Sequence, residues 1–132
     1  LFKDKINLLD VDHSAVDWNG KKQKDTSGEE NTIAIPGFEK VTLYANETTQ
    51  AVNFHNPEIN DCYFKISLIH PDGSVLWISD LIEPGKGMYS IELEKTLAVG
   101  EYENAVLKYE CFSLNDQSPL NGSEINLKLV VV

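Results

Sequence analysis

The chain has 132 residues, of which 42% are apolar and 24% charged, and its formal net charge is −10. This length suits one domain with a hydrophobic core, and the composition is that of a globular protein rather than a disordered one. All 11 basic residues are lysine, so the clustered positive charge that nucleic acids and anionic membranes require is missing, and we expect neither a nucleic-acid partner nor membrane contact by the domain itself.

Residues 1–32 are predicted to form an irregular N-terminal arm that ends in a polar tether. Residues 21–32, KKQKDTSGEENT, contain no large apolar residue, which is typical of a solvated linker. Residues 1–18 carry apolar side chains without a clear period, so no secondary structure is assigned to them. We find neither a signal-peptide core nor an apolar run of membrane-spanning length, and we expect a mature form whose anchoring segment lies outside this chain.

From Ile33 onward, short alternating apolar runs separated by turn residues predict one β-sandwich domain over residues 33–132. No interval is long and periodic enough for a crossover helix. Pro36-Gly37 should bulge the first strand, and Pro71-Asp72-Gly73 should turn a hairpin. The predicted strands cover residues 33–45, 50–56, 62–70, 74–82, 87–95, 100–114 and 123–132, with a loop over 115–122. The expected fold class is all-β: a seven-stranded antiparallel sandwich of the immunoglobulin or fibronectin III type.

Cys62 and Cys111 are predicted to lie close together in one sheet. In antibody domains the two cysteines lie on strands B and F of opposite sheets. Here Cys62 opens the third strand, which corresponds to C, and Cys111 closes the sixth, which corresponds to F. Because C and F are antiparallel neighbours, we expect a cross-strand disulfide or two buried thiols; the alternative is two unrelated small core residues. A disulfide would fit an oxidising location outside the cytoplasm.

The sequence contains no recognisable catalytic or metal-binding motif, so we expect no enzyme activity, no metal and no cofactor. Asp10, Asp12 and Ser14 match the first, third and fifth places of a calcium loop, but Ala15 and Lys21 replace its glycine and its bidentate glutamate. The histidines lie on separate segments without zinc-ligand spacing: His13, His55 and His70. A small metal-dependent enzyme built on these aspartates or histidines is the weakest alternative.

Four aromatic residues are candidates for an exposed binding surface. They fall on positions that face outward or lie at the edges of the predicted sheets: Tyr44, Tyr63, Trp77 and Tyr89. An exposed aromatic strip would mark a surface for a ligand or a partner protein. Trp77 fits the core better than the surface, because large aromatic rings dominate protein interiors.

Three segments resemble small surface-associated or lipoprotein-like proteins of low-GC Gram-positive bacteria: NPEINDCYFKISLIHPDGSVLWISDLIEPGK, LAVGEYENAVLKYECF and PLNGSEINLKL. The more specific part is NDCYFKISL together with LKYECF. The resemblance covers residues 33–132 and implies an extracellular location, an anchored N-terminus and one immunoglobulin-like or fibronectin-like sandwich. It carries no catalytic residues. A lipobox cysteine and a sortase signal are missing from this chain.

The expected function is a non-catalytic binding or adhesion module outside the cell, tethered by its N-terminal segment. Its expected partner is another surface protein or a glycan. The alternative is a ligand-specific sandwich that acts as a protein inhibitor or as a carbohydrate-binding module. A protruding loop at residues 115–121 would favour the inhibitor, and a planar Tyr/Trp strip would favour the carbohydrate-binding module.

Overall fold

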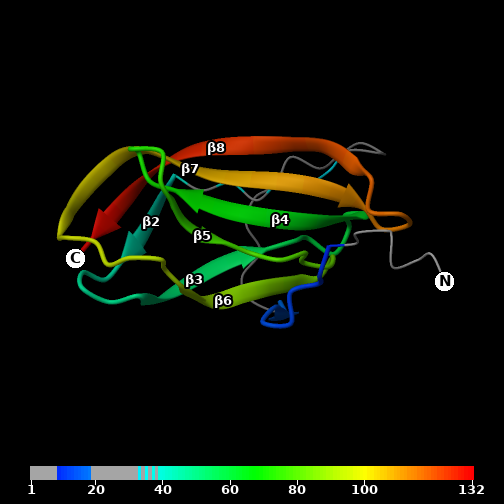
Figure 1. Ribbon diagram of the computed structural model, residues 1–132, viewed down its shortest axis with the longest axis horizontal. Coiled ribbons are helices and arrows are strands. Elements are labelled where there is room, and N and C mark those ends of the chain that lie inside the picture. Colours follow the sequence, from blue (N-terminus) through cyan, green and yellow to red (C-terminus); the bar gives the residue numbers. More distant parts are fainter. Residues whose placement is uncertain (1–8, 19–32, 34, 36, 38) are drawn as a thin grey trace.

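The computed structural model describes residues 9–18, 33, 35, 37 and 39–132. In this part of the chain the protein is all-β, with two sheets and no helix (Figure 1). The eight strands are β1 (Val16–Asp17), β2 (Lys40–Leu43), β3 (Thr49–His55), β4 (Cys62–Ile69), β5 (Val75–Ile78), β6 (Lys86–Glu92), β7 (Gly100–Ser113) and β8 (Pro119–Val131). Among the described residues, no helix is long and apolar enough to span a membrane.

The larger sheet has five strands in the order β2-β8-β7-β4-β5. At its centre β4 pairs with β7 in eight consecutive antiparallel pairs, from Cys62↔Ser113 to Ile69↔Val106. Alternate residues of a strand point to opposite faces of the sheet. Phe64, Ile66 and Leu68 therefore enter the core together, and all three are fully buried.

The expectation that every strand is antiparallel is wrong, because β2 pairs in parallel with β8, from Lys40↔Lys128 to Leu43↔Val131. No tight turn joins these two strands. They lie at opposite ends of the domain sequence, so hairpin geometry does not impose an antiparallel pairing on them. The first strand is also shorter than the predicted span of 33–45, and Pro36 lies outside the described residues.

The count of seven strands also differs from the structure, which has eight. The additional strand is β1, which comes from the predicted N-terminal arm. The last strand begins at Pro119 rather than at Ser123, and the predicted loop over 115–122 shrinks to a turn at residues 114–118. Pairing continues as far as Phe112↔Pro119 because β8 bulges between its pairs with Tyr109 and Cys111.

The smaller sheet has the order β1-β6-β3 and packs against the larger one (Figure 1). Side chains of both sheets form one core. Trp77 on β5 joins the two layers, since its ring centroid lies 5.7 Å from that of Phe54 on β3. The largest fully buried apolar residues of the core include Leu43, Phe54, Phe64, Ile66, Leu107, Tyr109 and Leu129.

The predicted hairpin turn at Pro71-Asp72-Gly73 is confirmed. Gly73 has a φ of 92°, a conformation that glycine adopts without strain. Asp72 Oδ1 accepts hydrogen bonds from the backbone N–H of Ser74 at 2.8 Å and from its Oγ at 2.6 Å. These two hydrogen bonds lower the pKa of Asp72 to about 2, because they stabilise the charged carboxylate.

The buried side chain of Asn56 connects β4 to the segment before β6. Its Nδ2 donates to the carbonyl oxygens of Cys62 at 2.8 Å and Ile82 at 2.9 Å. Its Oδ1 accepts a hydrogen bond from Asn60 Nδ2 at 2.9 Å. Every polar atom of this amide is thus used inside the protein, where water cannot replace a lost partner.

Asn56→Ala is expected to lower the free energy of unfolding by about 2–3 kcal/mol, because it leaves buried polar groups unsatisfied. Urea unfolding followed by tryptophan fluorescence measures the change. Asn126→Ala on β8 is the control, since Asn126 is exposed and its replacement should change stability by less than about 0.5 kcal/mol. Similar losses in the two variants would contradict the role of Asn56.

Candidate functional site

The two cysteines lie side by side at one end of the larger sheet. Cys62 pairs with Ser113, and Cys111 pairs with Phe64, so the cysteines are diagonal neighbours on the core face of β4 and β7. Each is a free thiol that is only 1% exposed, and their side chains form a hydrogen bond. Of the two forms that the sequence left open for a close pair, the structure contains the buried thiols.

This hydrogen bond makes the two thiols unequal. It lowers the pKa of Cys62, because a thiol that accepts a hydrogen bond from Cys111 is more stable as a thiolate. The same hydrogen bond, together with burial, raises the pKa of Cys111. Of the two thiols, Cys62 is therefore the one that loses its proton first.

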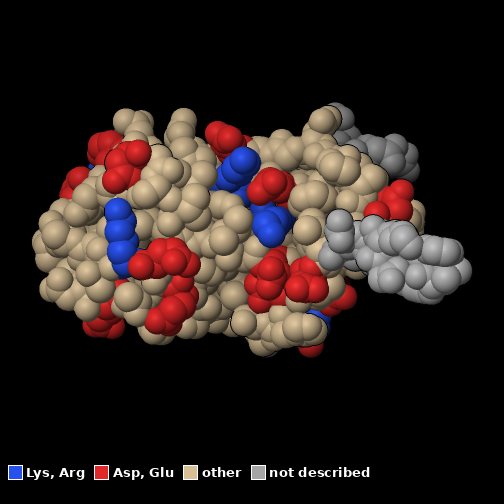
Figure 2. Space-filling model, viewed as in Figure 1, with Lys and Arg blue, Asp and Glu red and all other residues tan. Residues whose placement is uncertain are grey.

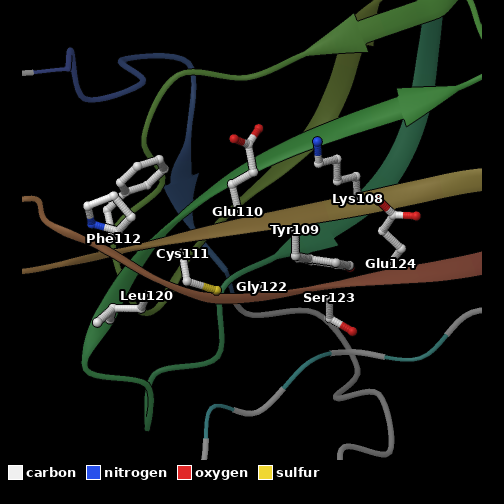
Figure 3. Close-up of a pocket in the computed structure, with 10 residues that line it drawn as sticks. Lys108, Tyr109, Glu110, Cys111, Phe112, Leu120, Gly122, Ser123 and Glu124 are labelled. Carbon is white, nitrogen blue, oxygen red and sulfur yellow. The ribbon is translucent and has the colours of Figure 1, made fainter.

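A pocket of about 480 Å³ opens on the hairpin of β7 and β8, beside Cys111 (Figure 3). It lies where β8 bulges away from β7 around Gly122. A Cβ at position 122 would lie 2.2 Å from the carbonyl oxygen of Tyr109, so only glycine fits there. Figure 3 shows Cys111 and Leu120 on one side of the hairpin and the side chain of Glu110 on the other. The remaining lining residues are Lys108, Phe112, Pro119, Ser123 and Glu124.

The chemistry of this pocket suits contact with an apolar group that has polar surroundings. Leu120 is 42% exposed although it is a large apolar residue, and the lining also includes the charged residues Lys108, Glu110 and Glu124.

The four aromatic residues predicted as a binding surface do not lie together. Tyr44 follows β2 and is 54% exposed, whereas Tyr63 lies at the opposite end of the larger sheet. Tyr89 belongs to β6 in the smaller sheet. Trp77 is 7% exposed and packs on Phe54, so it belongs to the core.

The register instead assembles a row of residues that the sequence did not indicate. Tyr63 on β4 lies opposite Phe112 on β7, and Phe112 lies opposite Pro119 on β8. All three are partly or fully exposed, and Phe112 and Pro119 also line the pocket. The alternation in YECFS indicates that Phe112 points away from the core. Which residues lie beside Phe112 follows only from the pairing of the three strands.

The residues considered as metal ligands serve other purposes. Both carboxylate oxygens of Asp12 accept hydrogen bonds from backbone N–H groups, Oδ1 from Ser14 at 2.8 Å and Oδ2 from Asp80 at 3.0 Å. His55 stacks on Trp18, and His70 lies in the hairpin after β4. No group of three or more His, Cys, Asp or Glu side chains that could hold a metal ion occurs within residues 9–18 and 39–132 or the three isolated described positions.

Refolding from urea in oxidised glutathione is expected to remove both thiols together; the treatment starts from the unfolded chain because the folded chain buries both thiols. One cysteine thiolate attacks the glutathione disulfide and releases one glutathione, and the other cysteine then displaces the second, leaving a disulfide between β4 and β7. Thiol titration after denaturation and intact mass measure the loss of two hydrogens. The single variants Cys62→Ser and Cys111→Ser are the controls, because each can only stop at a mixed disulfide. A refolded chain that keeps both thiols, or that retains a glutathione adduct, would contradict the pairing.

No protein-family model, no curated protein and no solved structure matches this chain. Its function therefore has to be inferred from its own residues, and the pocket on the β7–β8 hairpin is one concave surface that the described residues form.

Proposed function

We propose that the chain is a non-catalytic binding module at the cell surface, and that the pocket on the β7–β8 hairpin is its contact site. The observation that carries the proposal is the pocket itself, with the exposed apolar residue Leu120 in its lining. Concave, mostly apolar surfaces with a few polar groups are the usual form of ligand and partner sites. The proposed partner is another surface protein or a glycan.

The proposed fold family is an immunoglobulin-like or fibronectin III-like sandwich. If β3, β4, β5, β6, β7 and β8 are strands B, C, C′, E, F and G, the larger sheet contains G, F, C and C′, and the smaller sheet contains B and E. This division is the one that immunoglobulin variable domains use. Two strands depart from this division. β2, which precedes strand B in the chain, lies beside G, and β1 lies beside E, where strand D lies in those domains.

The proposed location is extracellular, with the anchor in a segment outside this chain. The resemblance of residues 33–132 to Gram-positive surface proteins supports it. So does the surface charge: Figure 2 shows acidic side chains in several groups on the visible face, with few lysines among them. A net charge of −10 keeps the surface soluble and self-repelling.

The structure offers less to the alternative roles. An inhibitor would use a protruding loop, but the chain between β7 and β8 forms a short turn at residues 114–118. A carbohydrate-binding module would use a planar strip of Tyr and Trp, but Tyr44, Tyr63 and Tyr89 are dispersed and Trp77 is buried. The binding module therefore has the better support.

Fluorescently labelled protein added to intact Gram-positive cells tests this function. We expect saturable binding, and Leu120→Glu should reduce it about tenfold, because a charge at the centre of an apolar contact removes a hot spot. Tyr89→Glu on the opposite sheet is the matched control and should bind like the native protein. Protease treatment of the cells beforehand separates a protein partner, whose binding is lost, from a glycan, whose binding remains.

Equal binding of the native protein and Leu120→Glu would contradict the role of the pocket, and absence of saturable binding to any cells would contradict the module. The location is tested separately, by digesting intact producing cells with trypsin and analysing the released peptides. Peptides of the chain should appear before the cells are lysed; their appearance only after lysis would contradict a surface location.

A further inference from the structure

Residues 9–18, here called the arm, cover one edge of the smaller sheet. β6 pairs with β3 on one side and with β1 on the other, through Val16↔Gly87 and Asp17↔Lys86. In Figure 1 the arm is the blue segment beside β6. Without the arm, β6 would be an edge strand with unpaired backbone groups, which is the usual template for strand addition.

The backbone of the arm contacts the segment 80–87 at two places. Beside the antiparallel pairs of β1, Trp18 N donates to the Gly85 carbonyl at 2.9 Å. Before the turn at residues 13–14, Val11 forms a parallel bridge with Leu81, where Asp12 N donates to the Leu81 carbonyl at 2.6 Å and Leu81 N donates to the Asp10 carbonyl at 2.9 Å. We call the segment 80–87 the acceptor edge.

The side chain of Trp18 gives this contact sequence specificity. Its ring stacks on His55 with centroids 3.7 Å apart and planes 5° apart, and its Nε1 donates to Asn53 Oδ1 at 2.6 Å. Gly87 makes the space for the indole, because a Cβ there would lie 2.8 Å from Trp18 Cδ1 and 2.8 Å from the Phe54 carbonyl.

Two further contacts at the ends of the arm fix its register on the domain. Lys86 Nζ lies 2.8 Å from Asp17 Oδ1, which pairs opposite charges beside the tryptophan. At the other end, Gln117 in the turn after β7 holds the backbone of Leu9, accepting its N–H at 2.7 Å and donating to its carbonyl at 3.2 Å. The backbone contacts at Leu9 therefore set the register of the arm, and the side chain of Trp18 supplies the sequence specificity.

We infer that the acceptor edge, with Asn53 and His55, is a peptide-binding site whose second occupant is the arm of another copy of this chain. The arm is connected to β2 by residues 19–39, which span at most about 75 Å when extended, enough to reach a neighbouring molecule. Exchange of the arm between two copies keeps every contact described above, so it costs little free energy.

The arm of the same chain competes for the site with a large advantage. Covalent attachment within one chain gives a segment an effective concentration in the millimolar range. The arm is therefore expected to dock on a second copy only where copies are crowded. A densely covered cell surface would crowd them, and this expectation alone rests on the proposed function. The exchange itself is a property of the chain in solution.

A labelled peptide of residues 9–18 tests the site on the full-length chain. It should bind the Trp18→Ala chain about tenfold more tightly than the native chain, because the weakened arm competes less for the same edge. The double variant Trp18→Ala with Gly87→Val should not bind it, since a side chain at position 87 fills the space of the indole. A labelled peptide carrying Trp18→Ala is the control for specificity.

The inference is overturned if the peptide fails to bind a folded Trp18→Ala chain, or if it binds the Gly87→Val double variant equally well. Light scattering of the native chain tests whether a second copy supplies the arm, at protein concentrations up to the effective concentration of about a millimolar. We expect dimers in the native chain and none in the Gly87→Val variant. A native chain that stays monomeric there overturns the second copy as occupant. Neither measurement uses cells or the β7–β8 pocket. A failure of the peptide-binding inference is therefore distinguishable from a failure of the proposed surface function.

Discussion

The register of β4 on β7 is the constraint on which the rest of the structure depends. Eight consecutive pairs fix which residues of the two central strands share a face, and a slip of one residue would exchange core and surface along the whole length. This register brings Cys62 against Cys111 on the core side and Tyr63 against Phe112 on the outer side. Because β7 continues directly into the hairpin with β8, the same register also positions the pocket around Gly122 and Leu120.

The edges of the two sheets explain how such a fold acquires contacts with other molecules. At β5, one of the two edge strands of the larger sheet, the Leu76 carbonyl accepts a hydrogen bond from the backbone N–H of Glu94 at 2.8 Å. At β6, the strand that would close the smaller sheet is supplied by residues far from it in the sequence. A domain that receives a strand from a distant segment of its own sequence can receive the same strand from a neighbour, since backbone hydrogen bonds do not distinguish the two sources.

Local patterns predicted the central strands, because a period of two and turn chemistry are encoded in neighbouring residues. The runs at 50–56, 62–70 and 100–114 and the turn at Asp72-Gly73 agree closely with the structure. The parallel pairing of β2 with β8 depends on contacts between distant segments, and the bulge at Gly122 resembles a loop in sequence. β1 has only two residues and no alternation; its one local signal is Gly87 inside a strand, which marks a close approach that Trp18 makes.

The central claim is that the arm is a docked strand that Trp18 holds in place. Two-dimensional NMR of the native chain tests it most directly, because an indole ring stacked on His55 shifts the signals of nearby protons. We predict nuclear Overhauser effects from the Trp18 indole to Gly87 Hα and the His55 ring, and large shifts at both residues in the Trp18→Ala variant. Absence of these effects, together with unchanged Gly87 and His55 signals in the variant, would contradict the account.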